Sequence, residues 1–205
     1  MSRDAERLER AQERPIVGGL PDVPGIVVAM RLTPGLGVHM RGLADELLVN
    51  DYPGATISRA EREMLATAVS AQNDCFFCMD SHAAHATALL ERADAVELVP
   101  LLDEIKLGSS EGLGDKMAAL LHIARTVGRA PRELTADDVA EAQAAGAVDA
   151  DVQLAVLIAA GFSMYNRMVD GFRAWTAPSP DAYRARAGEI AEHGYSAPPV
   201  AAVPR

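Results

Sequence analysis

Two cysteines, Cys75 and Cys78, are the only thiols of the chain, and two residues separate them. This C-x-x-C spacing suits a pair that cycles between dithiol and disulfide, and less often a metal site. On a helix, the thiols would share one face with His82 and His85, within an arc of roughly 80°. An imidazole one turn from a thiol can take its proton and return it to a leaving oxygen. The spacing therefore predicts base-assisted redox chemistry at a thiol.

A helix that starts at Asn73 or Asp74 would position these side chains, because either residue is a plausible N-cap. Both sulfur atoms would then lie in or near the first turn. There, free backbone N–H groups and the positive end of the helix dipole favour a thiolate over a thiol. The carboxylate of Asp74 would oppose this effect unless it caps the helix.

Two other interpretations of the thiol pair stay open. Cys75, Cys78, His82 and His85 are all zinc-ligand types. However, about 15 Å of straight helix separates the outermost Cα atoms, which is too far for one tetrahedral ion to take all four ligands. Two or three of them could still join ligands from elsewhere. Buried free cysteines also occur as plain core residues. The pattern favours redox chemistry over both.

The elements around the thiols are expected to be helices throughout. Ser58-Arg59-Ala60-Glu61 is a capping-box pattern that opens a helix expected to end near Ala71. Apolar residues recur at helical spacing between glycine and proline breaks elsewhere, and no strand alternation or internal repeat is found. The prediction is an all-α fold. Its helices are expected at about 37–49, 58–71, 75–91, 94–106, 117–128, 135–146, 150–173 and 181–193.

The length and charge of the chain bound its organisation and its partners. We expect an N-terminal arm over 1–34, a helical domain over 35–176, and a C-terminal helix with a flexible tail over 177–205. A net charge of −10 without a basic cluster argues against nucleic acid and anionic membrane as partners. The charged N-terminus carries no secretory signal, and the longest apolar run, 152–162, is too short to span a bilayer. We therefore expect a cytoplasmic protein, where a static disulfide is rare.

Glu63, on the helix before the cysteines, is the acid whose role the pattern alone does not decide. It lies nearly opposite the apolar stripe of its helix, on a face of small, uncharged residues. Another helix could pack there and bury it. By periodicity alone, however, a solvated glutamate is the default.

The spacing of Glu63, Cys75, Cys78 and His82 resembles the E-x11-C-x2-C-x3-H signature of the alkyl hydroperoxidase D-like proteins. These proteins belong to the carboxymuconolactone decarboxylase superfamily. The segments 58–73 and 166–172 look like the branch of the family described as peroxidase-related. The signature covers about twenty residues, and weaker similarity extends over roughly 35–175.

The resemblance implies a fold, an assembly and a role for each residue. The fold would be a helical bundle in which the Glu63 helix packs against the cysteine helix, assembled as a homo-oligomer, commonly a trimer or hexamer. Cys78 would be the attacking thiolate, and Cys75 the partner that closes the disulfide. His82 would relay protons, and Glu63 would hold and polarise it, which overrides the solvated default.

The same resemblance implies the partners of the reaction and leaves rivals. The substrate would be an organic hydroperoxide and the reductant an external dithiol, such as one on a lipoylated protein; no metal, haem or flavin is required. Phe76 and Phe77 replace a histidine that the family prototype has between its cysteines, so proton handling would differ and a bulkier peroxide would fit. His85 is either a second relay or a surface histidine, and the surface interpretation is favoured. The rivals are lactone decarboxylation or isomerisation, and a non-catalytic redox sensor or oligomeric scaffold.

Overall fold

The computed structural model of the chain describes residues 2–197 and 203, and within them all regular structure is helical, which confirms the all-α prediction. The α-helices are α1 (Arg3–Arg10), α2 (Val27–Leu32), α3 (Pro34–Leu48), α4 (Arg59–Gln72), α5 (Phe76–Arg92), α6 (Leu101–Lys106), α7 (Asp115–Arg129), α8 (Ala136–Ala144), α9 (Asp149–Phe172) and α10 (Arg184–His193). Short 3-10 turns occur at η1 (Val96–Leu98), η2 (Pro131–Glu133) and η3 (Pro180–Tyr183).

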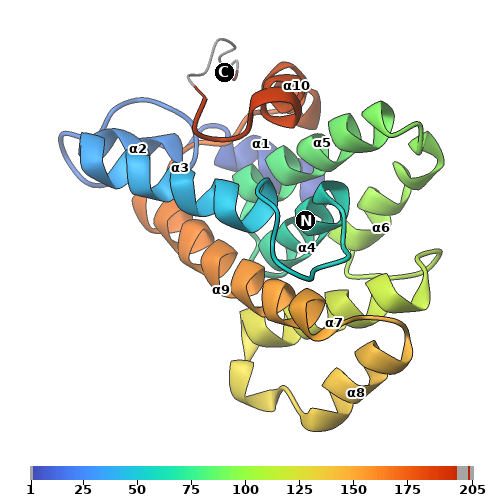
Figure 1. The fold of residues 1–205 in the computed structure, drawn as a ribbon. Coiled ribbons are helices and arrows are strands. Elements are labelled where there is room, and N and C mark those ends of the chain that lie inside the picture. The colour runs from blue at the N-terminus through green and yellow to red at the C-terminus, as the bar shows by residue number, and fades with distance from the viewer. Residues whose placement is uncertain (1, 198–202, 204–205) are drawn as a thin grey trace.

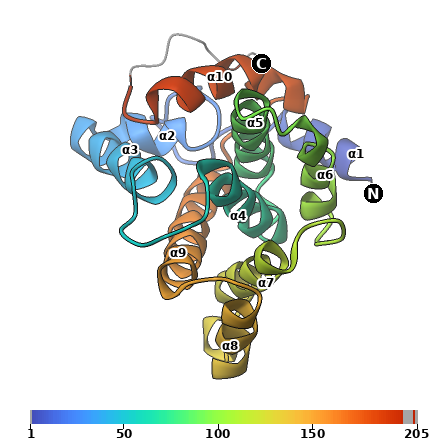
Figure 2. The ribbon, with the colours of Figure 1, turned by 45° about the vertical axis from the view of Figure 1, so that its right-hand side comes forward.

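Helix α4 lies at the centre of the bundle and packs against α5, α7 and α9 (Figures 1 and 2). Its start follows the predicted capping box: the Ser58 backbone N–H donates to Glu61 Oε2 at 2.6 Å, and the Glu61 N–H donates to Ser58 Oγ at 3.3 Å. Residues 62–71 are all buried. Helices therefore cover α4 on every side, including the face that carries Glu63.

The cysteine helix α5 starts at a different residue from the one predicted. Its N-cap is Cys75 itself, with no side-chain cap, and neither Asn73 nor Asp74 caps it. Asp74 has a φ of 54°, a left-handed conformation that reverses the chain between α4 and α5, and the Cys75 N–H then donates to the Ser70 carbonyl at 3.0 Å. Asn73 donates instead to Asn166 Oδ1 on α9 at 2.9 Å. The turn before the thiols is thus fastened to both α4 and α9.

The first 34 residues contain two helices that the sequence analysis did not predict. Helix α1 is held on α5 by a buried ion pair, in which Arg7 Nε donates to Asp80 Oδ2 at 2.7 Å. The segment between α1 and α2 runs across the thiol end of α5, where the Gly25 N–H donates to the Trp175 carbonyl at 3.0 Å. Phe77 packs directly on Gly25. The N-terminal region therefore covers the start of α5.

The C-terminal region returns to the same end of the bundle. Helix α10 packs across α5 (Figure 2), and the chain after it reaches α3. There the backbone N–H groups of Tyr195 and Ser196 donate to the Asp45 carboxylate at 2.6 and 3.0 Å. The flexible tail expected at the C-terminus lies, apart from residues 197 and 203, outside the described residues.

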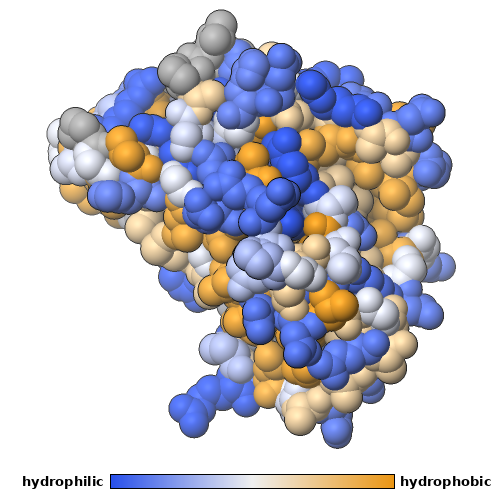
Figure 3. All heavy atoms as spheres, in the orientation of Figure 1, coloured by the Kyte–Doolittle hydropathy of each residue, from blue (hydrophilic) through white to orange (hydrophobic). Residues whose placement is uncertain are grey.

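Helix α9 is long and apolar enough to cross a membrane by length and composition alone, but half of its most apolar window is buried inside the protein. A core helix passes the same test, and α9 packs against α4 and α7 as a core helix does. Figure 3 shows that hydrophilic residues cover much of one face of the molecule, with hydrophobic residues among them toward its right-hand side.

Candidate active site

The two thiols lie side by side at the start of α5, 3.6 Å apart and without a disulfide bond. Cys75 is the N-cap and Cys78 is the third residue of the helix, close to its free backbone N–H groups. Both are buried, with 0% and 2% of their surface exposed. The pair is positioned for a disulfide, but a large reductant could reach it only if the covering segments moved.

The structure distinguishes the two thiols electrostatically. A hydrogen bond to Cys78, burial, and the charge of Cys78 raise the pKa of Cys75 well above its usual value. Asp170 of α9 adds a further carboxylate beside Cys75, and burial raises the pKa of Asp170 to about 6. These groups oppose the effect of the helix N-terminus at Cys75, and the thiolate expected at Cys78 stays a prediction. The thiol of Cys75 lies within hydrogen-bonding reach of both Cys78 and Asp170.

Glu63 and His82, predicted to act together, are brought into direct contact between α4 and α5. His82 Nδ1 lies 2.6 Å from Glu63 Oε2, and Glu63 is fully buried. Burial alone would raise the pKa of Glu63, but the charge of His82 and its hydrogen bond, together with the nearby His85, lower it to about 2. An ionised carboxylate only accepts hydrogen bonds, so Nδ1 of His82 carries the hydrogen. When the ring is neutral, its basic nitrogen is therefore Nε2.

His85 is not the surface histidine that the sequence analysis favoured. It is 4% exposed, because α10 and the chain after it cover this face of α5. Its Nδ1 atom lies 3.7 Å from Glu63 Oε2 and 2.9 Å from the hydroxyl group of Tyr195. Burial lowers the pKa of His85, although the nearby Glu63 acts in the opposite direction. Burial therefore favours the neutral ring.

Tyr195 is the site residue that the sequence analysis missed. Its hydroxyl group lies 2.7 Å from Glu63 Oε1 and 3.3 Å from His82 Nδ1, in addition to its contact with His85. Burial, with the charge and hydrogen bond of Glu63, raises the pKa of Tyr195 well above its usual value. The phenol thus donates its proton to Glu63 and accepts the Nδ1 hydrogen of His85. An aromatic residue after a glycine, in an aromatic-poor chain, was the only local signal.

A small cavity beside the thiols contains Cys78 and His82 but not Cys75. Its volume is about 40 Å³, enough for a few water-sized groups such as a hydroperoxyl group. The remaining lining is almost wholly apolar, so a peroxide there would meet one thiol and one imidazole. In this conformation the cavity has room for the hydroperoxyl group, and the organic part of a bulky peroxide would have to displace the side chains that line it. It is lined by Ile26, Met30, Ala44, Phe77, Cys78, His82, Phe162, Tyr165 and Tyr195.

Potential metal ligands also gather at this site, as two histidines of α5 and a glutamate from another helix, which is a combination that the sequence analysis left open. Among the described residues, Glu63, His82 and His85 are the one group of potential ligands whose atoms all lie within 4.8 Å of one another, and neither thiol belongs to it. Hydrogen bonds with Tyr195 already satisfy these atoms. An ion could bind there only by displacing the hydrogen bond between His82 and Glu63.

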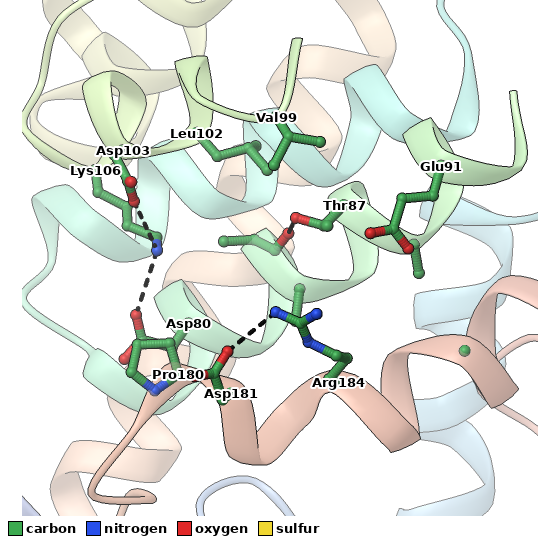
Figure 4. A pocket seen from close by; sticks show the side chains of 14 residues that line it. Asp80, Thr87, Glu91, Val99, Leu102, Asp103, Lys106, Pro180, Asp181 and Arg184 are labelled. Carbon is green, nitrogen blue, oxygen red and sulfur yellow. Dashed lines mark hydrogen bonds and ion pairs between the residues drawn. The ribbon is translucent and has the colours of Figure 1, made fainter. Parts of the chain in front are cut away.

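A larger hollow of about 210 Å³ lies between α5, α6 and the start of α10 (Figure 4). In Figure 4 the Lys106 ammonium group points between two carboxylates, 3.7 Å from Asp80 Oδ1 and 3.3 Å from Asp103 Oδ1. Arg184 pairs with Asp181 at 3.1 Å. The lining includes no thiol and no imidazole, and these charges pair with one another. The chemistry therefore belongs to the smaller cavity.

Comparisons with known proteins concern the family and the fold of the chain. Residues 40–111 match the carboxymuconolactone decarboxylase family. The solved structure of an alkylhydroperoxidase AhpD core, an uncharacterized peroxidase-related protein from Ralstonia eutropha JMP134, is 25% identical. That likeness covers 81% of this chain and 82% of that one, with a TM-score of 0.63.

A second solved structure, an uncharacterized peroxidase-related protein from Silicibacter sp. TM1040, shares the fold. It is 21% identical over 80% of this chain and 90% of that one, with a TM-score of 0.61. No curated protein matches the chain.

Proposed function

The family match and the shared fold support this chain as an alkyl hydroperoxidase D-like member of the carboxymuconolactone decarboxylase superfamily, and on that premise we propose that it is a thiol-dependent hydroperoxide reductase. The observation that carries the proposal is the asymmetric pair of thiols. Cys78 opens onto the cavity beside His82, and Cys75 lies 3.6 Å from it outside the cavity, with a raised pKa.

The first step is attack of the Cys78 thiolate on the terminal oxygen of an organic hydroperoxide. The O–O bond breaks, Cys78 becomes a sulfenic acid, and the alkoxide leaves after taking a proton from His82. The Cys75 thiol then attacks the sulfenic sulfur, so that a disulfide forms and water leaves. An external dithiol must reduce this disulfide by thiol–disulfide exchange before the next turnover.

Glu63 fixes the ring of His82 for this work. Its ionised carboxylate accepts the Nδ1 hydrogen at 2.6 Å, so Nε2 is the atom that exchanges protons with Cys78 and the leaving group. The negative charge also stabilises the imidazolium formed when Cys78 loses its proton. Both effects are those expected of a carboxylate that orients a catalytic histidine.

The buried position of both thiols favours one alternative, a redox sensor. With 0% and 2% exposure, Cys75 and Cys78 admit a small peroxide more easily than a protein reductant. A sensor and a peroxidase share the first chemical step, and only catalytic turnover with a dithiol separates them. Lactone decarboxylation uses no thiol pair and leaves the contact between Cys75 and Cys78 without a role.

The partners and the assembly belong to the same proposal. We propose an organic hydroperoxide as substrate and a small or lipoyl-bound dithiol as reductant, in a cytoplasmic homo-oligomer of three or six subunits. The net charge of −10 argues against nucleic acid and membrane as partners. Light scattering of the purified protein measures the subunit number directly, and a monomeric mass would contradict this part of the proposal.

The test is the consumption of cumene hydroperoxide with dihydrolipoamide as the reductant. We expect catalytic turnover by the wild type, none above background by Cys78→Ser, and a loss on the order of 100-fold in His82→Ala. If the wild type consumes no peroxide beyond the free-dithiol background, the peroxidase proposal fails. If Cys78→Ser keeps the wild-type rate, the assignment of the attacking thiol fails instead. A wild type that forms the disulfide once, without turnover, is a sensor.

A further inference from the structure

The hydroxyl group of Tyr195 is the point where the polar side chains of the site meet, although this residue lies 132 positions after Glu63. We propose that Tyr195 is a positioning residue for the proton relay that Glu63 and His82 form. Its hydroxyl group donates to the second oxygen of Glu63, and this hydrogen bond weakens the hold of the carboxylate on the proton of His82. This inference rests on the proposed function and assigns a further residue to the same site.

The two oxygens of the buried Glu63 carboxylate accept hydrogen bonds from different side chains. Oε2 of Glu63 accepts from His82 at 2.6 Å, and Oε1 accepts from Tyr195 at 2.7 Å. Without the phenol hydroxyl, Oε1 would be buried with no donor, and a buried carboxylate oxygen without a partner is strongly disfavoured. The nearest compensation is a positive charge on His82. Tyr195 therefore supplies the second donor that the carboxylate would otherwise lack, so that its charge does not rest on His82 alone.

The same hydroxyl group also keeps His85 out of the relay. It accepts the Nδ1 hydrogen of His85 at 2.9 Å, whereas Glu63 Oε2 lies 3.7 Å from that nitrogen. If the hydroxyl were absent, the N–H group of His85 could turn to Glu63 and compete with His82. Tyr195 thus leaves Oε2 of Glu63 to His82 alone.

The backbone around Tyr195 is built to place it. Gly194 has a φ of 77° and a ψ of −174°, a combination that only glycine adopts readily. A Cβ atom there would lie 2.8 Å from Asp45 Oδ1. Asp45 accepts the N–H groups of Tyr195 and Ser196 on its two oxygens, at 2.6 and 3.0 Å. The turn at Gly194, which Asp45 of α3 holds in place, therefore positions the phenol ring of Tyr195.

The sign of the effect follows from the proton that Cys78 and His82 exchange in the proposed mechanism. A reaction that needs one proton on this pair has a bell-shaped pH profile. If the pair is thiolate and imidazolium, stabilising the imidazolium moves the alkaline limb to higher pH. If it is thiol and imidazole, the acid limb moves to higher pH instead. Loss of the Tyr195 hydroxyl should thus raise the pH optimum in either case.

The experiment compares Tyr195→Phe with Tyr165→Phe. Both tyrosines line the same cavity, but the hydroxyl group of Tyr165 donates to the Met40 carbonyl at 2.8 Å and does not contact the relay. The histidine-ring resonances of His82 are followed by NMR over pH, and kcat/KM for cumene hydroperoxide is measured over the same range. We expect both curves to move to higher pH by roughly half a unit or more in Tyr195→Phe, and to keep their positions in Tyr165→Phe.

Curves that coincide for Tyr195→Phe and the wild type would overturn the inference, and so would an equal displacement in Tyr165→Phe. If Tyr195→Phe does not fold, Gly194→Ala displaces the phenol without removing it and should move both curves in the same direction. A wild type without peroxide turnover would sink the proposed function. The NMR comparison would still decide the role of Tyr195, since it needs no catalysis.

Discussion

Replacing Glu63 with glutamine tests whether the site needs the charge of this carboxylate or only its shape. Glutamine keeps the size of the side chain and one carbonyl acceptor, but it carries no charge. In Glu63→Gln, the ring of His82 loses its ionised partner at 2.6 Å, while the surrounding helices keep their packing.

The size of the effect can be worked from the structure. A pKa of Glu63 held at about 2, against an ordinary 4.5, corresponds to about 3 kcal/mol of preference for the charged form at this buried position. Most of that preference comes from the contact with His82. If it is lost in the transition state, kcat/KM for the hydroperoxide should fall by about 100-fold, since each factor of ten corresponds to about 1.4 kcal/mol.

Stability should also fall in this variant. The glutamine oxygen can still accept one hydrogen bond, but the charged form that the site prefers is gone, so the free energy of unfolding at pH 7 should fall by about 2–3 kcal/mol. Glu63→Leu removes both acceptors and strands the donors of His82 and Tyr195, which should cost about 2–6 kcal/mol. Urea unfolding followed by circular dichroism measures both variants.

Glu61→Gln is the matched control, because it makes the same chemical change two residues earlier on α4. Glu61 caps the helix through Ser58 and takes no part in the site. We expect its kcat/KM to stay within about twofold of the wild type and its stability to fall by about 1 kcal/mol. The reasoning is refuted if Glu63→Gln keeps kcat/KM within about threefold of the wild type, or if Glu61→Gln loses as much.

Further predictions concern the parts that hold the site in place. Burial alone would raise the pKa of Asp151, but hydrogen bonds from the loop before α4 lower it to about 2. The ionised carboxylate therefore contributes about 2–3 kcal/mol to the free energy of unfolding. This contribution is present above pH ~4 and is lost as the pH falls toward 2. Urea titrations should therefore show Asp151→Asn less stable than the wild type by that amount at pH 7 and nearly equal to it near pH 2; equal stability at pH 7 would contradict this. Arg7→Ala leaves the buried Asp80 with only a lysine 3.7 Å away and should lower the free energy of unfolding by about 2–4 kcal/mol, whereas a loss below about 1 kcal/mol would show that α1 is held by other contacts. Gly25→Ala would place a Cβ atom 2.1 Å from the ring of Phe77 and so displace the segment between α1 and α2 from the start of α5. Iodoacetamide should then label the cysteines faster than in the wild type. An unchanged labelling rate would mean that this segment does not cover them.

The helices after α2 were predictable because their signals are local, whereas α1 and α2 were not predicted. The Ser58–Glu61 capping box marks the start of α4 in the sequence, and the structure places both of its hydrogen bonds there. The start of α5 was misassigned, because Asn73 and Asp74 look like caps. Asn73 instead bonds to Asn166, and Asp74 adopts a left-handed turn, neither of which a short window of sequence can show.

The candidate site was predictable only in part. The pairing of Glu63 with His82 came from a resemblance in spacing, since periodicity alone placed Glu63 in solvent. The burial of His85 depends on α10, and its partner Tyr195 lies 110 residues further along the chain. The raised pKa of Cys75 depends on the neighbouring thiol and on burial. Long-range packing decides each of these features.

The central claim is that Cys78 is the thiolate that attacks the peroxide, and its most direct test is to trap the product of that attack. Reduced Cys75→Ser protein, which cannot close the disulfide, is mixed with an equimolar amount of cumene hydroperoxide and then with dimedone. Mass spectrometry should find the adduct on Cys78, with an equal amount of cumyl alcohol released. An adduct on Cys75 in the reciprocal Cys78→Ser protein, with none on Cys78 in Cys75→Ser, would contradict the account.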